Sequence, residues 1–129
     1  MYKSESRPAI PSAEVKIGTK DIESFQNETL RPIIKQLHSL LLNHFSNLLF
    51  TKKSEYFKIS ENKKANYIHS IFQKEIRYKS ELKGMIIGNL TVQEFDQYTS
   101  NSRLIDKRIY SIVEERILTN QKELQKLPK

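Results

Sequence analysis

Three histidines are the residues of this chain best suited to metal binding or to acid–base catalysis. His38, His44 and His69 each lack a second histidine or a carboxylate three or four residues away, the spacing that places two ligands on one helix face. The sequence therefore predicts no metal site within one helix, although a site assembled across helices stays open. We expect each histidine to lie on a helix flank, bonded to a neighbour or to water.

Other catalytic signatures are missing as well. The chain has no cysteine, which removes thiolate nucleophiles, disulfides and cysteine-ligated metals. It has three glycines and no Gly-x-Ser-x-Gly elbow, so neither a phosphate-binding loop nor a dinucleotide fingerprint can be written. We therefore expect no cofactor, and the sequence favours binding over catalysis without deciding between them.

The densest run of polar side chains lies just before an apolar segment bounded by Gly84 and Gly88. Gly88 is expected to end a helix in the left-handed conformation, and the two glycines could also mark a close helix contact. The alternative for the polar run is a solvated helix face with mutually paired charges. We select this run as the candidate interaction surface: Glu75, Arg77, Tyr78, Lys79, Glu81 and Lys83.

A second candidate is a basic patch that could bind nucleic acid or another anion. The net charge is +7, and residues 29–90 carry eleven basic against four acidic side chains. Aromatic residues at 56, 57 and 67 are interleaved with the lysines and could stack on bases, while the lysines bind phosphates. The alternative is an ordinary lysine-rich surface. The patch consists of Lys52, Lys53, Lys58, Lys63, Lys64 and Lys74.

Helices must position these candidates, because no run of alternating polar and apolar residues flanked by turn signals is present. We expect an all-α fold, a single irregular helical bundle of four to six helices in one domain at residues 21–129. Residues 1–20 contain Pro8 and Pro11 and no sustained apolar period, so they predict an extended or disordered N-terminal arm.

Apolar spacing and capping residues place the helices. A first helix starts near Asp21, and Pro32 is expected either to end it near Leu30 or to kink a longer one. The stretch 33–50 has the widest apolar stripe and should be the most buried helix. Further helices are expected at 61–80, from a capping box at Thr91 to Ser100, and from Ser102 onward. Side chains assigned to the core by these patterns include Leu40, Ala65, Ile76, Val92, Phe95 and Leu104.

Four segments carry a resemblance to a known family. They are 7–11 (RPAIP), 25–32 (FQNETLRP), 72–88 (FQKEIRYKSELKGMIIG) and 91–98 (TVQEFDQY). Together they resemble a family of short, helical bacterial proteins of uncharacterised function whose members are sometimes labelled glyoxalase. The resemblance implies a helical fold but no site residues. The metal-ligand and strand patterns of glyoxalases are missing from this chain, so that activity is not carried over.

These observations favour a non-enzymatic protein-interaction or regulatory module that binds another protein, or itself, through a helical surface. One alternative is a basic nucleic-acid-associated protein using residues 52–79. A second is an enzyme with an inter-helix pocket built from residues such as His38, His69, Glu75, Arg77 and Tyr78. The absence of cysteine and of an apolar segment near residue 1 predicts a cytoplasmic protein without membrane insertion.

Overall fold

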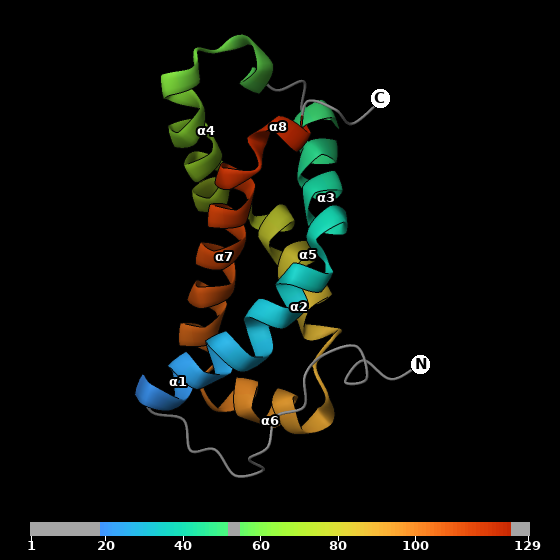
Figure 1. The fold of residues 1–129 in the computed structure, drawn as a ribbon, viewed down its shortest axis with the longest axis vertical. Coiled ribbons are helices and arrows are strands. Elements are labelled where there is room, and N and C mark those ends of the chain that lie inside the picture. The colour runs from blue at the N-terminus through green and yellow to red at the C-terminus, as the bar shows by residue number, and fades with distance from the viewer. Residues whose placement is uncertain (1–18, 52–54, 125–129) are drawn as a thin grey trace.

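All regular structure in the described residues is helical, as the sequence predicts, but it is divided into more helices than the expected four to six (Figure 1). The computed structural model describes residues 19–51 and 55–124. The predicted arm lies outside these ranges, except that Thr19 and Lys20 begin the first helix. The helical elements are α1 (Thr19–Phe25), the π-helix η2 (Gln26–Leu30), α2 (Arg31–Gln36), α3 (His38–Thr51), the 3-10 helix η3 (Tyr56–Lys58), α4 (Glu61–Lys74), α5 (Ile76–Ile87), α6 (Val92–Ser100), α7 (Ser102–Thr119) and α8 (Gln121–Leu124).

Pro32 does not end the first helical run. Of the two expected alternatives, an end near Leu30 and a kink in a longer helix, the end is not found, because α1, η2 and α2 follow one another without an intervening loop. The N–H of Arg31 donates to the carbonyl of Gln26, a five-residue step that defines the π-turn. Pro32 follows this widened turn as the second residue of α2.

The predicted helix at 33–50 is divided at Leu37, which lies between α2 and α3. Leu37 has φ −92° and ψ 13°, a bridge conformation outside the helical region. Figure 1 shows α2 and α3 running in different directions on either side of this residue. The run that contains α2 packs on α7, whereas α3 packs on α8, so the chain turns where its packing partner changes. Leu40, expected in the core, is exposed as a result.

A second division falls at Glu75, between α4 and α5, so the predicted helix at 61–80 is also two helices. Glu75 has φ −88° and ψ 88°, values outside the helical region, and it separates α4 from α5. Ile76, the first residue of the new helix, is 74% exposed rather than buried. Ala65 of α4 is exposed too, and Lys64 beside it is buried.

The capping box that opens α6 is present as predicted. Thr91 Oγ1 accepts from the N–H of Glu94 at 3.1 Å, and Glu94 Oε1 accepts from the N–H of Thr91 at 2.9 Å. This exchange satisfies two N–H groups that the helix itself leaves free. It also faces Glu94 inward, so the expected burial of Val92 and Phe95 is wrong, and both are exposed.

Gly88 ends α5 without the expected left-handed turn. Its φ is −60°, a right-handed value that any residue can adopt. A Cβ at this position would lie 3.2 Å from the carbonyl oxygen of Gly84, so the tight fit to the preceding turn is what favours glycine. Gly84 is exposed and a Cβ there would meet nothing within 4 Å, which gives no support for a close helix contact at that residue.

Helix α7 occupies the middle of the core. It packs against η2, α4, α5 and α6, and it lies between α4 and α5 in Figure 1. Leu104, assigned to its apolar stripe from the sequence, is exposed. The other five members of the predicted stripe are buried: Ile105, Ile109, Ile112, Val113 and Ile117.

The capping box gives a stability prediction. Replacing the hydroxyl in Thr91→Ala should lower the free energy of unfolding by about 1 kcal/mol, because the N–H of Glu94 loses its acceptor. Thr91→Ser keeps the hydroxyl and should remain within about 0.5 kcal/mol of the wild type. Urea denaturation of the three proteins measures both differences, and equal stability of the alanine and serine variants would contradict the capping role.

Candidate functional site

A polar recess lies between α3 and α5 and includes most of the candidate interaction surface. Its volume is about 340 Å³. Four of the six selected residues form one of its walls, namely Glu75, Arg77, Tyr78 and Glu81. The opposite wall comes from α3. Four residues of α3 form this opposite wall: His44, Asn47, Leu48 and Thr51.

His44 connects the two walls of the recess. Its Nε2 lies 2.8 Å from Glu81 Oε1, and its ring stacks on Tyr78 with centroids 5.0 Å apart. Because a carboxylate only accepts, Nε2 carries the proton of this hydrogen bond. Nδ1 is buried and has no hydrogen-bond partner among the described residues. Neither ring nitrogen is therefore free to exchange a proton with a ligand in the recess.

Glu81 is the charged centre of this arrangement. It accepts from His44 and also from Arg77 Nε at 3.1 Å, one helical turn earlier. The hydrogen bond from His44 is the main cause, and that from Arg77 the second, of a pKa for Glu81 below its usual value. Arg77 is 91% exposed, so its charge is well solvated and the pair contributes mainly to local geometry.

The recess also contains a buried phenol. Tyr78 is almost fully buried between His44, Phe45 and Phe72, and its ring packs edge-on against both phenylalanines. Its hydroxyl has no hydrogen-bond partner within the described part of the chain. Burial, with a smaller contribution from the charge of Glu114, raises the pKa of Tyr78 far above its usual value. The hydroxyl therefore stays protonated and acts only as a neutral group.

The remaining two selected residues lie away from the recess. Lys79 Nζ lies 5.4 Å from the centre of the Tyr110 ring on α7, a cation–π contact. Lys83 Nζ donates to Asp106 Oδ2 at 3.4 Å, and Asp106 also accepts from Tyr98. Both lysines attach α5 to α7, so the structure does not bring them together with the other four.

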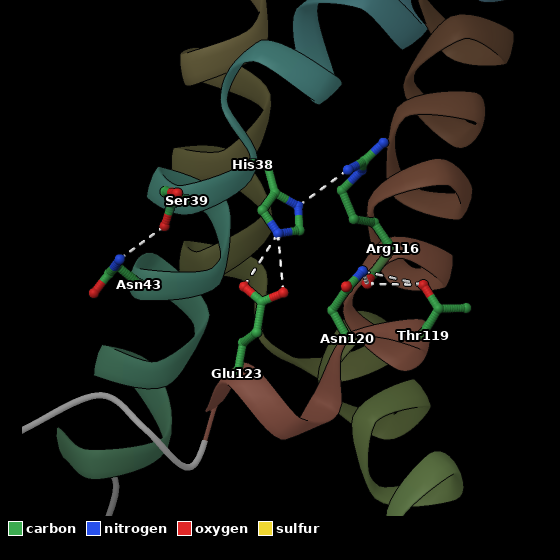
Figure 2. A network of polar contacts seen from close by, with 7 residues as sticks. All are labelled: His38, Ser39, Asn43, Arg116, Thr119, Asn120 and Glu123. Carbon is green, nitrogen blue, oxygen red and sulfur yellow. Dashed lines mark hydrogen bonds and ion pairs between the residues drawn. The ribbon is translucent and has the colours of Figure 1, made fainter.

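The other two histidines do not join the recess. His69 Nδ1 lies 2.9 Å from Glu114 Oε2, on the exposed side of the α4–α7 contact. His38 Nδ1 accepts from Arg116 at 3.0 Å, and its Nε2 lies 3.2 Å from Glu123 Oε1 (Figure 2). Each of the three histidines thus contacts a glutamate that is far away in the sequence. These contacts agree with the expected positions on helix flanks. His38 and His69, which the enzyme alternative placed with Glu75, Arg77 and Tyr78, do not line the recess.

The basic patch is only partly available to a ligand. Lys64 is buried, donates to Glu61 and lies 4.9 Å from the centre of the Tyr56 ring. Tyr56 is fully buried and cannot stack on a base; its burial, helped by the charge of Glu61, raises its pKa to about 12. Phe57 stacks on Phe50. Lys58, Lys63 and Lys74 are exposed, Lys52 and Lys53 lie outside the described residues, and nucleic-acid binding here stays a prediction.

The sequence patterns did not indicate that His44 and the α3 wall belong to the site. A weak signal existed, since Asn47 and Thr51 follow the histidine at three and seven residues and so share its helix face. What the spacing could not show was that Glu81 of another helix lies opposite. In the described ranges, no group of three or more histidines or carboxylates could hold a metal ion, and no helix is long and apolar enough to cross a membrane.

Comparisons of the chain with protein families, with curated proteins and with solved structures give no significant match. The family resemblance of the four sequence segments therefore stays a prediction. No activity, ligand or partner is transferred to this chain from another protein. Its function must be argued from its own geometry.

The recess predicts a pH dependence of stability. Because its pKa is lowered in the folded state, Glu81 contributes stability above the unfolded value of 4.5, and this contribution is lost as the pH falls through the folded value. The difference in unfolding free energy between the wild type and Glu81→Gln should shrink on going from about pH 6.5 to about pH 3. Urea denaturation across this range measures it, with exposed Glu115→Gln as the control. A difference that is constant with pH would contradict the assignment.

Proposed function

We propose that this chain is a non-enzymatic interaction module that binds another protein through the surface formed by the α3–α5 recess and Ile76. The observation that carries the proposal is the position of Ile76. It is 74% exposed and lies between Glu75 and Arg77, which both line the recess. A large apolar side chain beside a polar hollow is a common arrangement at the anchor of a protein interface.

The chemistry of the recess supports binding rather than catalysis. A general base must present a free basic atom to the substrate. The Nε2 of His44 is used by Glu81 and its Nδ1 is buried, so the histidine does not offer one. Tyr78 is held protonated by its burial. The recess can therefore recognise hydrogen-bonding groups, but the groups that line it are poorly placed to move protons.

The same geometry indicates what kind of partner fits. The partner would cover Ile76 with an apolar side chain and place a hydrogen-bonding side chain in the recess beside Asn47 and Thr51. Ile76 is the first residue of α5, directly after the break at Glu75, and its side chain is exposed. A folded protein or a helical peptide supplies both contacts at once. We also propose, as expected from the sequence, that the protein is cytoplasmic and that its helices form an irregular bundle.

Ile76→Asp provides the test. Tagged wild-type and variant chains are used to recover partners from nuclease-treated native lysate, and each recovered protein is then purified and titrated against the chain. Loss of the apolar anchor should lower the affinity for the true partner by about tenfold or more. Val92→Asp is the matched control, since Val92 is 81% exposed on α6 and does not line the recess. Its partner affinity should remain within about twofold of the wild type.

Self-association is resolved with the same variants. If the partner is a second copy, sedimentation velocity should show wild-type and Val92→Asp dimers and an Ile76→Asp monomer at equal concentration. The proposal fails if Ile76→Asp reduces neither the affinity for any purified partner nor the formation of a dimer. It also fails if both variants weaken binding equally.

A further inference from the structure

A second cleft lies between the first helical run and α7, on residues that the recess does not use. Its volume is about 720 Å³, within the range of small-molecule sites. Three cationic side chains line it: Arg31 and Lys35 from α2, and Arg116 from α7. Pro32 and Ile112 supply an apolar part of the wall. The other lining residues are the amides Asn27 and Gln36.

The positive charge of this cleft is not neutralised by neighbouring acids. Within the described ranges, no carboxylate forms an ion pair with Arg31, Lys35 or Arg116. Glu115 lines an adjoining hollow of about 240 Å³ that shares Arg31 and Arg116 with the cleft. Three unneutralised cations facing one small cleft attract an anion strongly.

Both arginines are held in place by neutral acceptors. Arg31 Nε donates to Asn27 Oδ1 at 3.2 Å, and Arg116 Nη1 donates to His38 Nδ1 at 3.0 Å. Because a guanidinium only donates, the Nδ1 of His38 carries no proton, and its Nε2 donates to Glu123 (Figure 2). In Figure 2 one terminal nitrogen of Arg116 points at His38 and the other points away from it. Each guanidinium is thus oriented while its remaining N–H groups stay available.

We infer that this cleft binds a small molecule carrying a phosphoryl group, with Arg31, Lys35 and Arg116 on the phosphoryl oxygens and the apolar part of the ligand against Pro32 and Ile112. Oriented guanidinium groups match phosphate oxygens in paired hydrogen bonds, and lysine adds a point charge. The apolar wall distinguishes an organic phosphate from a free inorganic ion. This inference does not rest on the proposed function, because the two sites share no lining residue.

The probe is phenyl phosphate, which carries one phosphoryl group on one apolar ring. Its binding is measured by isothermal titration and by amide chemical shifts at constant ionic strength. Arg31→Gln/Lys35→Gln removes two cleft charges from exposed positions, and glutamine keeps the helix propensity. Arg103→Gln/Lys107→Gln removes an arginine and a lysine at the same four-residue spacing from exposed positions on α7 outside the cleft and serves as the matched control.

The expected result is that the cleft variant binds phenyl phosphate about tenfold more weakly than the wild type, whereas the control variant changes by less than about twofold. Shifts should centre on the amides of α2 and on those near Ile112. Inorganic phosphate should bind more weakly than phenyl phosphate, and phenol should not bind.

Three outcomes would overturn the inference. These are no phenyl phosphate binding to the wild type at millimolar concentration, equal weakening in both double variants, or binding of inorganic phosphate as tight as that of phenyl phosphate. The second would show a general charge effect. Retention of a single-stranded oligonucleotide through Arg31 and Lys35, without phenyl phosphate binding, would identify a nucleic-acid surface instead.

Discussion

The burial of one apolar stripe on α7 is the interaction on which the rest of the structure depends. Ile105, Ile109, Val113 and Ile117 are at most 1% exposed, and they repeat at the four-residue spacing of a helix face. At roughly 25 cal/mol per Å² of apolar surface, burying such side chains is the largest favourable contribution available to a chain of this size. Helices from both ends of the chain must therefore close around α7.

The polar residues on the flanks of α7 then determine which groups meet. Asp106 binds α5 and α6, Arg108 binds η2, Glu114 binds α4 and Arg116 binds α3. Each of these contacts is worth little alone, because most are half-exposed. Together they fix how neighbouring helices are rotated about their axes. That rotation places one set of side chains around the α3–α5 recess and another in the cationic cleft.

The sequence was a good guide to the type of element and a poor guide to its ends. Apolar periodicity predicted helices throughout, and the capping box at Thr91 marked a helix start correctly, since both signals are local. The breaks at Leu37 and Glu75 carry no glycine or proline, so no local residue signal marks them. For the site, the sequence selected Glu81 but not His44, because their contact joins residues 37 positions apart and no local spacing encodes it.

Native-state hydrogen exchange of the α7 amides tests most directly whether this helix organises the fold. If the other helices depend on it, the amides of residues 105–117 should exchange only through complete unfolding, with a free energy equal to that from urea denaturation. The amides of α3 and α6 should exchange at equal or lower free energy. Exchange of α7 through a local opening while α3 remains protected would contradict the account, because the two binding surfaces would then not depend on the burial of α7.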